Sequence, residues 1–298
     1  MKKGHAIWVF GDYRNYFQNR VTLQILAKAV DLAAATKGSV CAVVFGNRVD
    51  EYVAEYIAHG ARKVYVVDHP ALAAYSMETY AWLMSRLVRR YQPETLLVGA
   101  TRFGQEMAPR IAKQLGTGLT ADCINLDIDE KGLLVQIAPS FGGNLIAKIV
   151  TPHHRPQMAT VRPGTFHELP HDYAAQGEVI SLPLPENLPK ERVRLVTSEH
   201  RPSKKKKIEE ADIVICGGRG MGSKGKFKKL FDLVFITNFG HCLTAGMHVT
   251  TLGKRYQLFS DRTQVLGLWQ RRDDLLMLDQ RSRHIGKHCL AMRACAIE

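Results

Sequence analysis

A glycine-rich turn is the feature of this sequence whose residue types most clearly suit chemistry. Residues 211–220 (Ala-Asp-Ile-Val-Ile-Cys-Gly-Gly-Arg-Gly) predict a strand that ends in this turn, and residues 226–233 then have the apolar spacing of a helix. Glycines let backbone N–H groups approach a phosphate, and a helix N-terminus adds partial positive charge. Arg219 can hold a pyrophosphate through two parallel hydrogen bonds. The motif fits a phosphate site, but glycine-rich turns also close loops that bind nothing.

A second candidate site is Ala100-Thr101-Arg102, which follows an apolar segment at 95–99 and precedes a helix predicted over 106–115. In open α/β sheets, ligands bind beyond the carboxyl ends of the strands, so these residues are placed to contact a ligand. The alternative is an ordinary strand-to-helix turn in which Thr101 caps the helix. The sequence leaves both interpretations open.

The elements that must position these residues alternate between strand and helix over the first 165 residues. Near-continuous apolar segments such as 39–45 are typical of parallel strands buried on both faces. The predicted strands are 6–10, 39–45, 63–67 and 95–99, and the predicted helices are 22–35, 50–58, 77–89 and 106–115. This alternation predicts an α/β fold with a doubly wound parallel sheet. From 127 to 161 the pattern becomes extended, with Gly142-Gly143 as the turn of a hairpin.

Composition divides the chain into two predicted domains. Residues 168–207 are rich in proline and charge, which predicts an extended connector rather than a packed element. The N-terminal α/β domain is therefore expected to span residues 1–167. A second, Rossmann-like domain is expected over 208–298, within which 235–298 lack clear periodicity.

The bulk properties exclude several classes of protein. No apolar segment approaches the roughly 20 residues of a membrane span. Asp12 and Arg14 end the first apolar segment without a small-residue cleavage site, so no signal peptide is expected. The six cysteines include no Cys-x-x-Cys pair, which argues against a disulfide framework or zinc site and favours a reducing cytoplasm.

The formal net charge of +13 is concentrated at 204–207, at 224–229 and beyond Lys254. One interpretation is a surface for nucleic acid or acidic membrane. No aromatic residue lies among the lysines at 204–207, so base stacking is not indicated. We therefore expect no nucleic-acid partner, and assign the charge to a solvated connector and to a site for an anionic cofactor or acidic partner.

Three segments in fixed order carry a family resemblance. They are 115–122 (Leu-Gly-Thr-Gly-Leu-Thr-Ala-Asp), 140–147 (Ser-Phe-Gly-Gly-Asn-Leu-Ile-Ala) and 157–164 (Gln-Met-Ala-Thr-Val-Arg-Pro-Gly). The sequence resembles the alpha subunit of the electron transfer flavoproteins, including the FixB-type members. The resemblance extends from about residue 7 to about residue 234.

The resemblance implies an electron carrier rather than a catalyst with its own substrate. In that family an N-terminal domain similar to adenine-nucleotide-binding proteins precedes a domain that holds FAD. A Gly-Gly-Arg-Gly turn of the second domain contacts the cofactor, and it falls here on Gly217, Gly218, Arg219 and Gly220. A beta subunit packs against both domains to form a heterodimer. Dehydrogenases, such as the acyl-CoA dehydrogenases of fatty acid beta-oxidation, supply the electrons.

The resemblance ends within the tail of the sequence. Neither the family's Thr-Gly-x-x-Val turn nor its Gly-Ile-Ser-Gly-Ala-x-Gln-His loop is found between residues 235 and 298. A diverged tail that still folds in the family manner and a tail translated out of frame are the two explanations. Because the segment supplies few credible strands, we expect 235–298 to be the least ordered part of the chain. His284 and His288 are four residues apart but lack the intervening glutamate of a His-Glu-x-x-His zinc motif, so no metal is expected. The alternative function is a nucleotide-binding or scaffold subunit without flavin, because one glycine-rich turn holds only part of an FAD.

Overall fold

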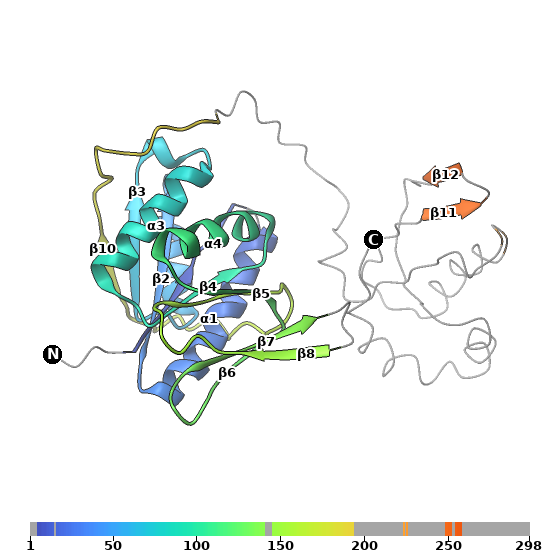
Figure 1. Cartoon of the computed structure of the whole chain (residues 1–298). Coiled ribbons are helices and arrows are strands. Elements are labelled where there is room, and N and C mark those ends of the chain that lie inside the picture. The colour runs from blue at the N-terminus through green and yellow to red at the C-terminus, as the bar shows by residue number, and fades with distance from the viewer. Residues whose placement is uncertain are drawn as a thin grey trace. The chain divides into compact units, whose positions relative to one another are not determined.

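A parallel β-sheet forms the centre of the N-terminal unit (Figure 1). The computed structural model describes residues 5–14, 16–140, 145–193, 223, 225, 248–251 and 254–257. The chain divides into two units, Met1–Ser198 and Glu199–Glu298. In the described part of the first unit, seven strands hydrogen-bond in the order β10-β3-β2-β1-β4-β9-β5, and all of these pairs are parallel.

The seven strands of this sheet include the four that were predicted from apolar segments of the sequence. Their bounds are β1 Ala6–Phe10, β2 Ser39–Gly46, β3 Lys63–Asp68, β4 Thr95–Gly99, β5 Leu119–Cys123, β9 Gln157–Val161 and β10 Glu178–Ser181. All five residues of β4 and of β9 are buried, as expected for strands covered on both faces. The doubly wound α/β fold predicted for this part of the chain is confirmed.

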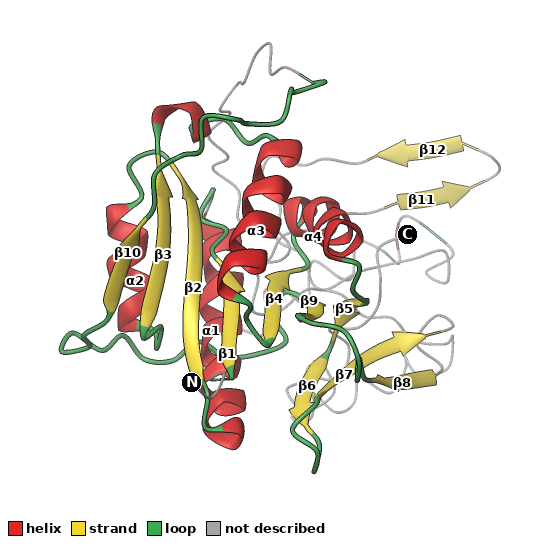
Figure 2. Cartoon of the chain, turned by 60° about the vertical axis from the view of Figure 1, so that its left-hand side comes forward, coloured by secondary structure: helices red, strands yellow, loops and turns green. Residues whose placement is uncertain are grey.

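Helices cover both faces of the sheet (Figure 2). The helices α1 (Tyr16–Thr36) and α2 (Asp50–Ala58) pack on one face, and α3 (Met77–Tyr91) and α4 (Arg102–Leu115) pack on the other. A short 3-10 helix, η1 (Pro70–Leu72), precedes α3. Successive strand residues alternate between the two cores, because a strand points consecutive side chains to opposite faces. Thus Val9 joins the core under α1, and Trp8 joins the core under α3.

A smaller antiparallel sheet lies beside the main one in the same unit. Its strands are β6 (Asn125–Ile128), β7 (Leu134–Ser140) and β8 (Leu145–Ile149), paired in that order. Ser140 pairs with Leu145, so the hairpin expected around Gly142-Gly143 is present in its strands. The turn itself lies outside the described residues.

The expected connector contains an element that the sequence analysis missed. Residues 178–181 form β10, which pairs in parallel with β3 from Glu178↔Lys63 to Ser181↔Val66. Leu182, Leu184 and Leu188 follow it and pack against the core under α3. The prediction that this whole segment is an unpacked connector is therefore wrong for these residues. The described prolines of this segment, Pro170, Pro183, Pro185 and Pro189, lie outside β10, where a missing N–H costs no sheet hydrogen bond.

In the second unit the structure describes one hairpin, formed by β11 (His248–Thr251) and β12 (Lys254–Gln257). The predicted Rossmann-like strand, turn and helix between 211 and 233 lie outside the described residues, apart from Ser223 and Gly225. Most of the tail at 235–298 also lies outside the described residues, so the expectation that it is the least ordered part stays a prediction. Within the described residues, no helix is long and apolar enough to cross a membrane.

Candidate functional site

The sheet has a topological switch point between β1 and β4. From β1 the chain proceeds through β2 to β3 on one side, and α3 then returns it to β4 on the other side. The loops that follow β1 and β4 consequently diverge at the carboxyl edge, where doubly wound sheets bind ligands. We call the residues gathered here, Asp12, Arg14, Tyr75, Tyr80, Thr101 and Phe103, the switch-point cluster.

A buried carboxylate occupies the centre of the switch-point cluster. Asp12 is only 3% exposed. Its Oδ2 accepts a hydrogen bond from Thr101 Oγ1 at 2.9 Å, and its Oδ1 accepts one from Arg14 Nε at 2.9 Å. Its backbone N–H donates to Thr22 Oγ1 at 3.0 Å. These bonds link the loop after β1 to helix α1 and to the start of α4, and they balance the cost of burying the charge.

Arg14 turns its guanidinium onto aromatic rings. The guanidinium carbon lies 4.0 Å from the ring centroid of Phe103, 4.3 Å from that of Tyr75 and 5.6 Å from that of Tyr80. Nη1 and Nη2 are buried and have no hydrogen-bond acceptor. The π faces of the rings attract the cation in place of acceptor oxygens, and this attraction strengthens where water is excluded.

The hydroxyl of Thr101 makes two hydrogen bonds, one as acceptor and one as donor. Its hydroxyl accepts a hydrogen bond from the Gly104 N–H at 3.2 Å, which caps α4, and donates its own proton to Asp12. The capping interpretation of Ala100-Thr101-Arg102 is thus confirmed. Arg102 is exposed at the first turn of the helix. Asp12 and Arg14 were not assigned to a site from the sequence, although both follow the predicted strand at 6–10 within four residues.

A second polar cluster joins two of the segments that carried the resemblance. Arg162 donates to Asp122 from Nε at 3.1 Å to each carboxylate oxygen, and from Nη2 at 2.5 Å to Oδ2. Asp122 has a left-handed backbone, with φ of 57°, at an irregularity between Thr120 and Cys123. Its N–H donates to Thr160 Oγ1, and Arg162 N–H donates to Cys123 O. The hydrogen bonds to Asp122 raise the pKa of Arg162, so the guanidinium stays charged at every physiological pH.

Comparison with known proteins assigns the chain to a family. The family model described as "Electron transfer flavoprotein domain" matches residues 7–187. The chain belongs to the electron transfer flavoprotein family. It is an alpha-type, FixB-like subunit, as its relatives indicate.

Three relatives illustrate the similarity. The electron transfer flavoprotein subunit alpha of Thermoanaerobacterium thermosaccharolyticum is 43% identical over 227 residues, which cover 76% of this chain and 69% of the relative. Protein FixB of Clostridium saccharobutylicum is 38% identical over 76% of this chain and 68% of its own length. The subunit LctC of a lactate dehydrogenase (NAD(+),ferredoxin) from Acetobacterium woodii is 34% identical, over 87% of this chain and 60% of its own length.

The two described cysteines of this electron transfer flavoprotein subunit are not suited to nucleophilic chemistry. Burial raises the pKa of Cys41 to about 11 and that of Cys123 to about 12. Both thiols therefore stay protonated near neutral pH, and a thiol is a far poorer nucleophile than a thiolate. Within the described residues there is also no group of three or more side chains suited to hold a metal ion.

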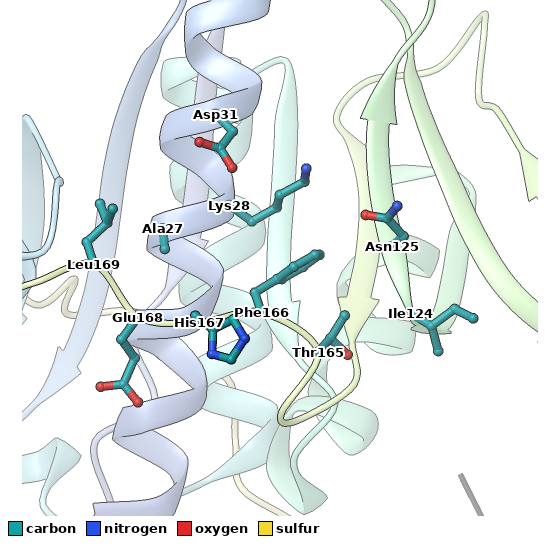
Figure 3. A pocket seen from close by; sticks show the side chains of 10 residues that line it. All are labelled: Ala27, Lys28, Asp31, Ile124, Asn125, Thr165, Phe166, His167, Glu168 and Leu169. Carbon is teal, nitrogen blue, oxygen red and sulfur yellow. The ribbon is translucent and has the colours of Figure 1, made fainter. Parts of the chain in front are cut away.

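Two open hollows lie away from the switch-point cluster. The first, of about 590 Å³, lies between α1, the start of β6 and residues 165–169 (Figure 3). Lys28 Nζ lies 5.6 Å from the Phe166 ring centroid there, and the nearby Glu168 accepts a bond from Arg20 at 2.6 Å. The second, of about 840 Å³, is lined by α2 and residues 171–177.

The residues expected to bind FAD, Gly217, Gly218, Arg219 and Gly220, lie outside the described residues.

Proposed function

We propose that this chain is the FAD-carrying alpha subunit of a heterodimeric electron transfer flavoprotein. It would accept electrons from flavin dehydrogenases, such as acyl-CoA dehydrogenases, and pass them to a downstream acceptor. The observation that carries the proposal is the family match over residues 7–187, together with the alpha-subunit names of the relatives. The chain then acts as a carrier and not as an enzyme with a substrate of its own.

We assign FAD to the glycine-rich turn at Gly217, Gly218, Arg219 and Gly220. This donor set suits a dinucleotide because three glycines expose backbone N–H groups and the guanidinium supplies a planar pair of donors for the pyrophosphate. When bound, the isoalloxazine ring supplies the redox chemistry, and the protein supplies binding, orientation and charge. The surplus of basic residues beyond 204 favours an anionic cofactor.

The small antiparallel sheet supports a beta-type subunit as the partner. Strand β8 presents Leu145, Ile146 and Ile149 at 58%, 64% and 39% exposure, and Val150 follows at 43%. No described strand pairs with the outer edge of β8. These exposed apolar side chains lie on both faces of β8, because a strand points consecutive side chains to opposite faces. Exposed apolar side chains on an open edge strand are characteristic of a protein interface, because both features favour association.

Co-expression with a beta-type subunit tests the proposal. We expect the two chains to purify together, with a flavin absorbance band and FAD released on denaturation. The alternative of a nucleotide-binding or scaffold subunit predicts co-purification without any flavin band. Colourless heterodimer, after reconstitution with excess FAD, would therefore reject the flavin assignment while retaining the partner.

A further inference from the structure

The switch-point cluster has the chemistry of a site for a cation. Its charged member facing inward is the carboxylate of Asp12, which is almost completely buried. Around it the rings of Tyr75, Tyr80 and Phe103 pack edge to face, with Tyr75 4.5 Å from Phe103 and 5.0 Å from Tyr80 between centroids. Aromatic faces are electronegative, so ring faces beside a carboxylate attract a planar cation and repel a phosphate.

The backbone at this edge is also closed to a phosphate. A phosphate-binding turn needs a glycine whose open side faces the ligand. At Gly11, directly after β1, that space is filled by Tyr56, because a Cβ there would lie 2.5 Å from Tyr56 Cε2. At Gly46, at the end of β2, a Cβ would overlap the hydroxyl of Tyr13. The glycines that follow β1 and end β2 are thus covered by the protein's own tyrosines.

We propose that the switch-point cluster is an internal guanidinium site, permanently occupied by Arg14. In it Asp12 fixes the guanidinium through Nε, while Phe103 and Tyr75 cover its faces. The N-terminal unit therefore binds no nucleotide at this cluster, despite the fold it shares with nucleotide-binding domains. Arg14 instead clamps the loop after β1 to the first turn of α4 and to the segment before α3.

Replacement of Arg14 in the full-length chain tests the clamp. We expect Arg14→Ala to lower the melting temperature by roughly 5–10 °C, on the scale usual for the loss of a buried interaction in a unit of this size. The control is Arg102→Ala, which removes the same charge from the same edge but from an exposed side chain with no aromatic contact. Equal melting temperatures for the two variants would overturn the proposal.

Chemical rescue identifies the ligand class. Methylguanidinium chloride at millimolar concentration should restore part of the lost melting temperature in Arg14→Ala, but not in Arg102→Ala, and tetramethylammonium chloride should restore neither. Arg14→Lys keeps the charge without the planar fork, so it should melt between Arg14→Ala and the wild type. A lysine variant as stable as the wild type, or equal rescue of both alanine variants, would contradict a guanidinium site.

Nucleotide binding gives an independent measurement. If the switch-point cluster held a nucleotide, Arg14 would be its phosphate ligand, and Arg14→Ala would weaken AMP and ATP binding at least tenfold. On our proposal the equilibrium-dialysis isotherms for labelled AMP and ATP are the same for wild type and Arg14→Ala. Loss of AMP or ATP binding in that variant alone would overturn the proposal. The proposed function, which places FAD at residues 217–220, is unaffected by either result.

Discussion

The hydroxyl of Thr101 is the single group whose removal should most clearly expose how the switch point is held together. Thr101 is 5% exposed, donates to the buried carboxylate of Asp12 and accepts from the N–H of Gly104. Thr101→Val keeps the size and branching of the side chain and removes only the hydroxyl. The variant therefore tests hydrogen bonding rather than packing.

The expected cost follows from the two bonds. Loss of a helix N-cap costs about 1 kcal/mol, and loss of a hydrogen bond to a charged group costs about 1.5–3 kcal/mol. We expect Thr101→Val to reduce the free energy of unfolding by about 2.5–4 kcal/mol. For a unit of 150–250 residues, this corresponds to a fall in melting temperature of roughly 5–15 °C.

Urea and thermal unfolding followed by circular dichroism measure the effect. Thr101→Ser is the matched control, because it keeps the hydroxyl and loses a methyl group, and it should stay within about 1.5 kcal/mol of the wild type. A double-mutant cycle with Asp12→Asn isolates the bond between the two side chains. If Thr101→Val were as stable as Thr101→Ser, or if the cycle gave no coupling, the Asp12–Thr101 bond would not be a main support of this edge.

Three further predictions follow from other parts of the chain. Burial raises the pKa of Cys41 to about 11 and that of Cys123 to about 12, above the pKa values of the same thiols in the unfolded chain. The contribution of the two protonated thiols to the free energy of unfolding is therefore complete below about pH 9. It is lost as the pH rises toward the pKa values of the folded chain. At pH 8 neither thiol should react with iodoacetamide until the chain is unfolded with urea. Mass spectrometry of digested peptides measures the reaction, and alkylation of either thiol in the folded chain would contradict the prediction. Ile146→Asp should weaken co-purification with a beta-type subunit without changing the melting temperature, because Ile146 is 64% exposed. The control, Lys148→Asp on the same strand, should have a smaller effect. Equal retention of the partner by both variants would argue against β8 as the interface. Arg219→Lys should reduce FAD retention by the equivalent of about 1–3 kcal/mol despite its conserved charge, and unchanged flavin occupancy after gel filtration would reject the pyrophosphate contact.

Local sequence determined most of the elements of the main sheet. The segments 6–10, 50–58 and 95–99 were predicted with the bounds that β1, α2 and β4 have in the structure. They were readable because a parallel strand covered on both faces is continuously apolar, and a surface helix repeats its apolar positions every three to four residues. The helix α1 begins at Tyr16, six residues before the predicted start. The prediction began where apolar positions first repeat at helical spacing, and the first turn has no acidic residue to mark an earlier start.

Tertiary structure alone decided the position of β10. Its residues Glu-Val-Ile-Ser are exposed or half-buried and lie in a segment rich in proline. Nothing local marks them as part of the sheet. They form a strand because the edge of β3 offers unpaired backbone groups, and a hydrogen-bonding edge more than a hundred residues away is invisible to periodicity.

The sequence predicted one part of the switch-point cluster, and only the tertiary structure shows the rest. The sequence by itself predicted that Thr101 follows a buried strand and can cap the next helix, because capping depends only on residues within one turn. That its hydroxyl also meets Asp12, 89 positions away, follows from the order of the strands. The role of Arg14 was likewise hidden, since an arginine in a loop is ordinarily solvated. Only the fold brings Tyr75 and Phe103 around it and turns a surface charge into part of the interior.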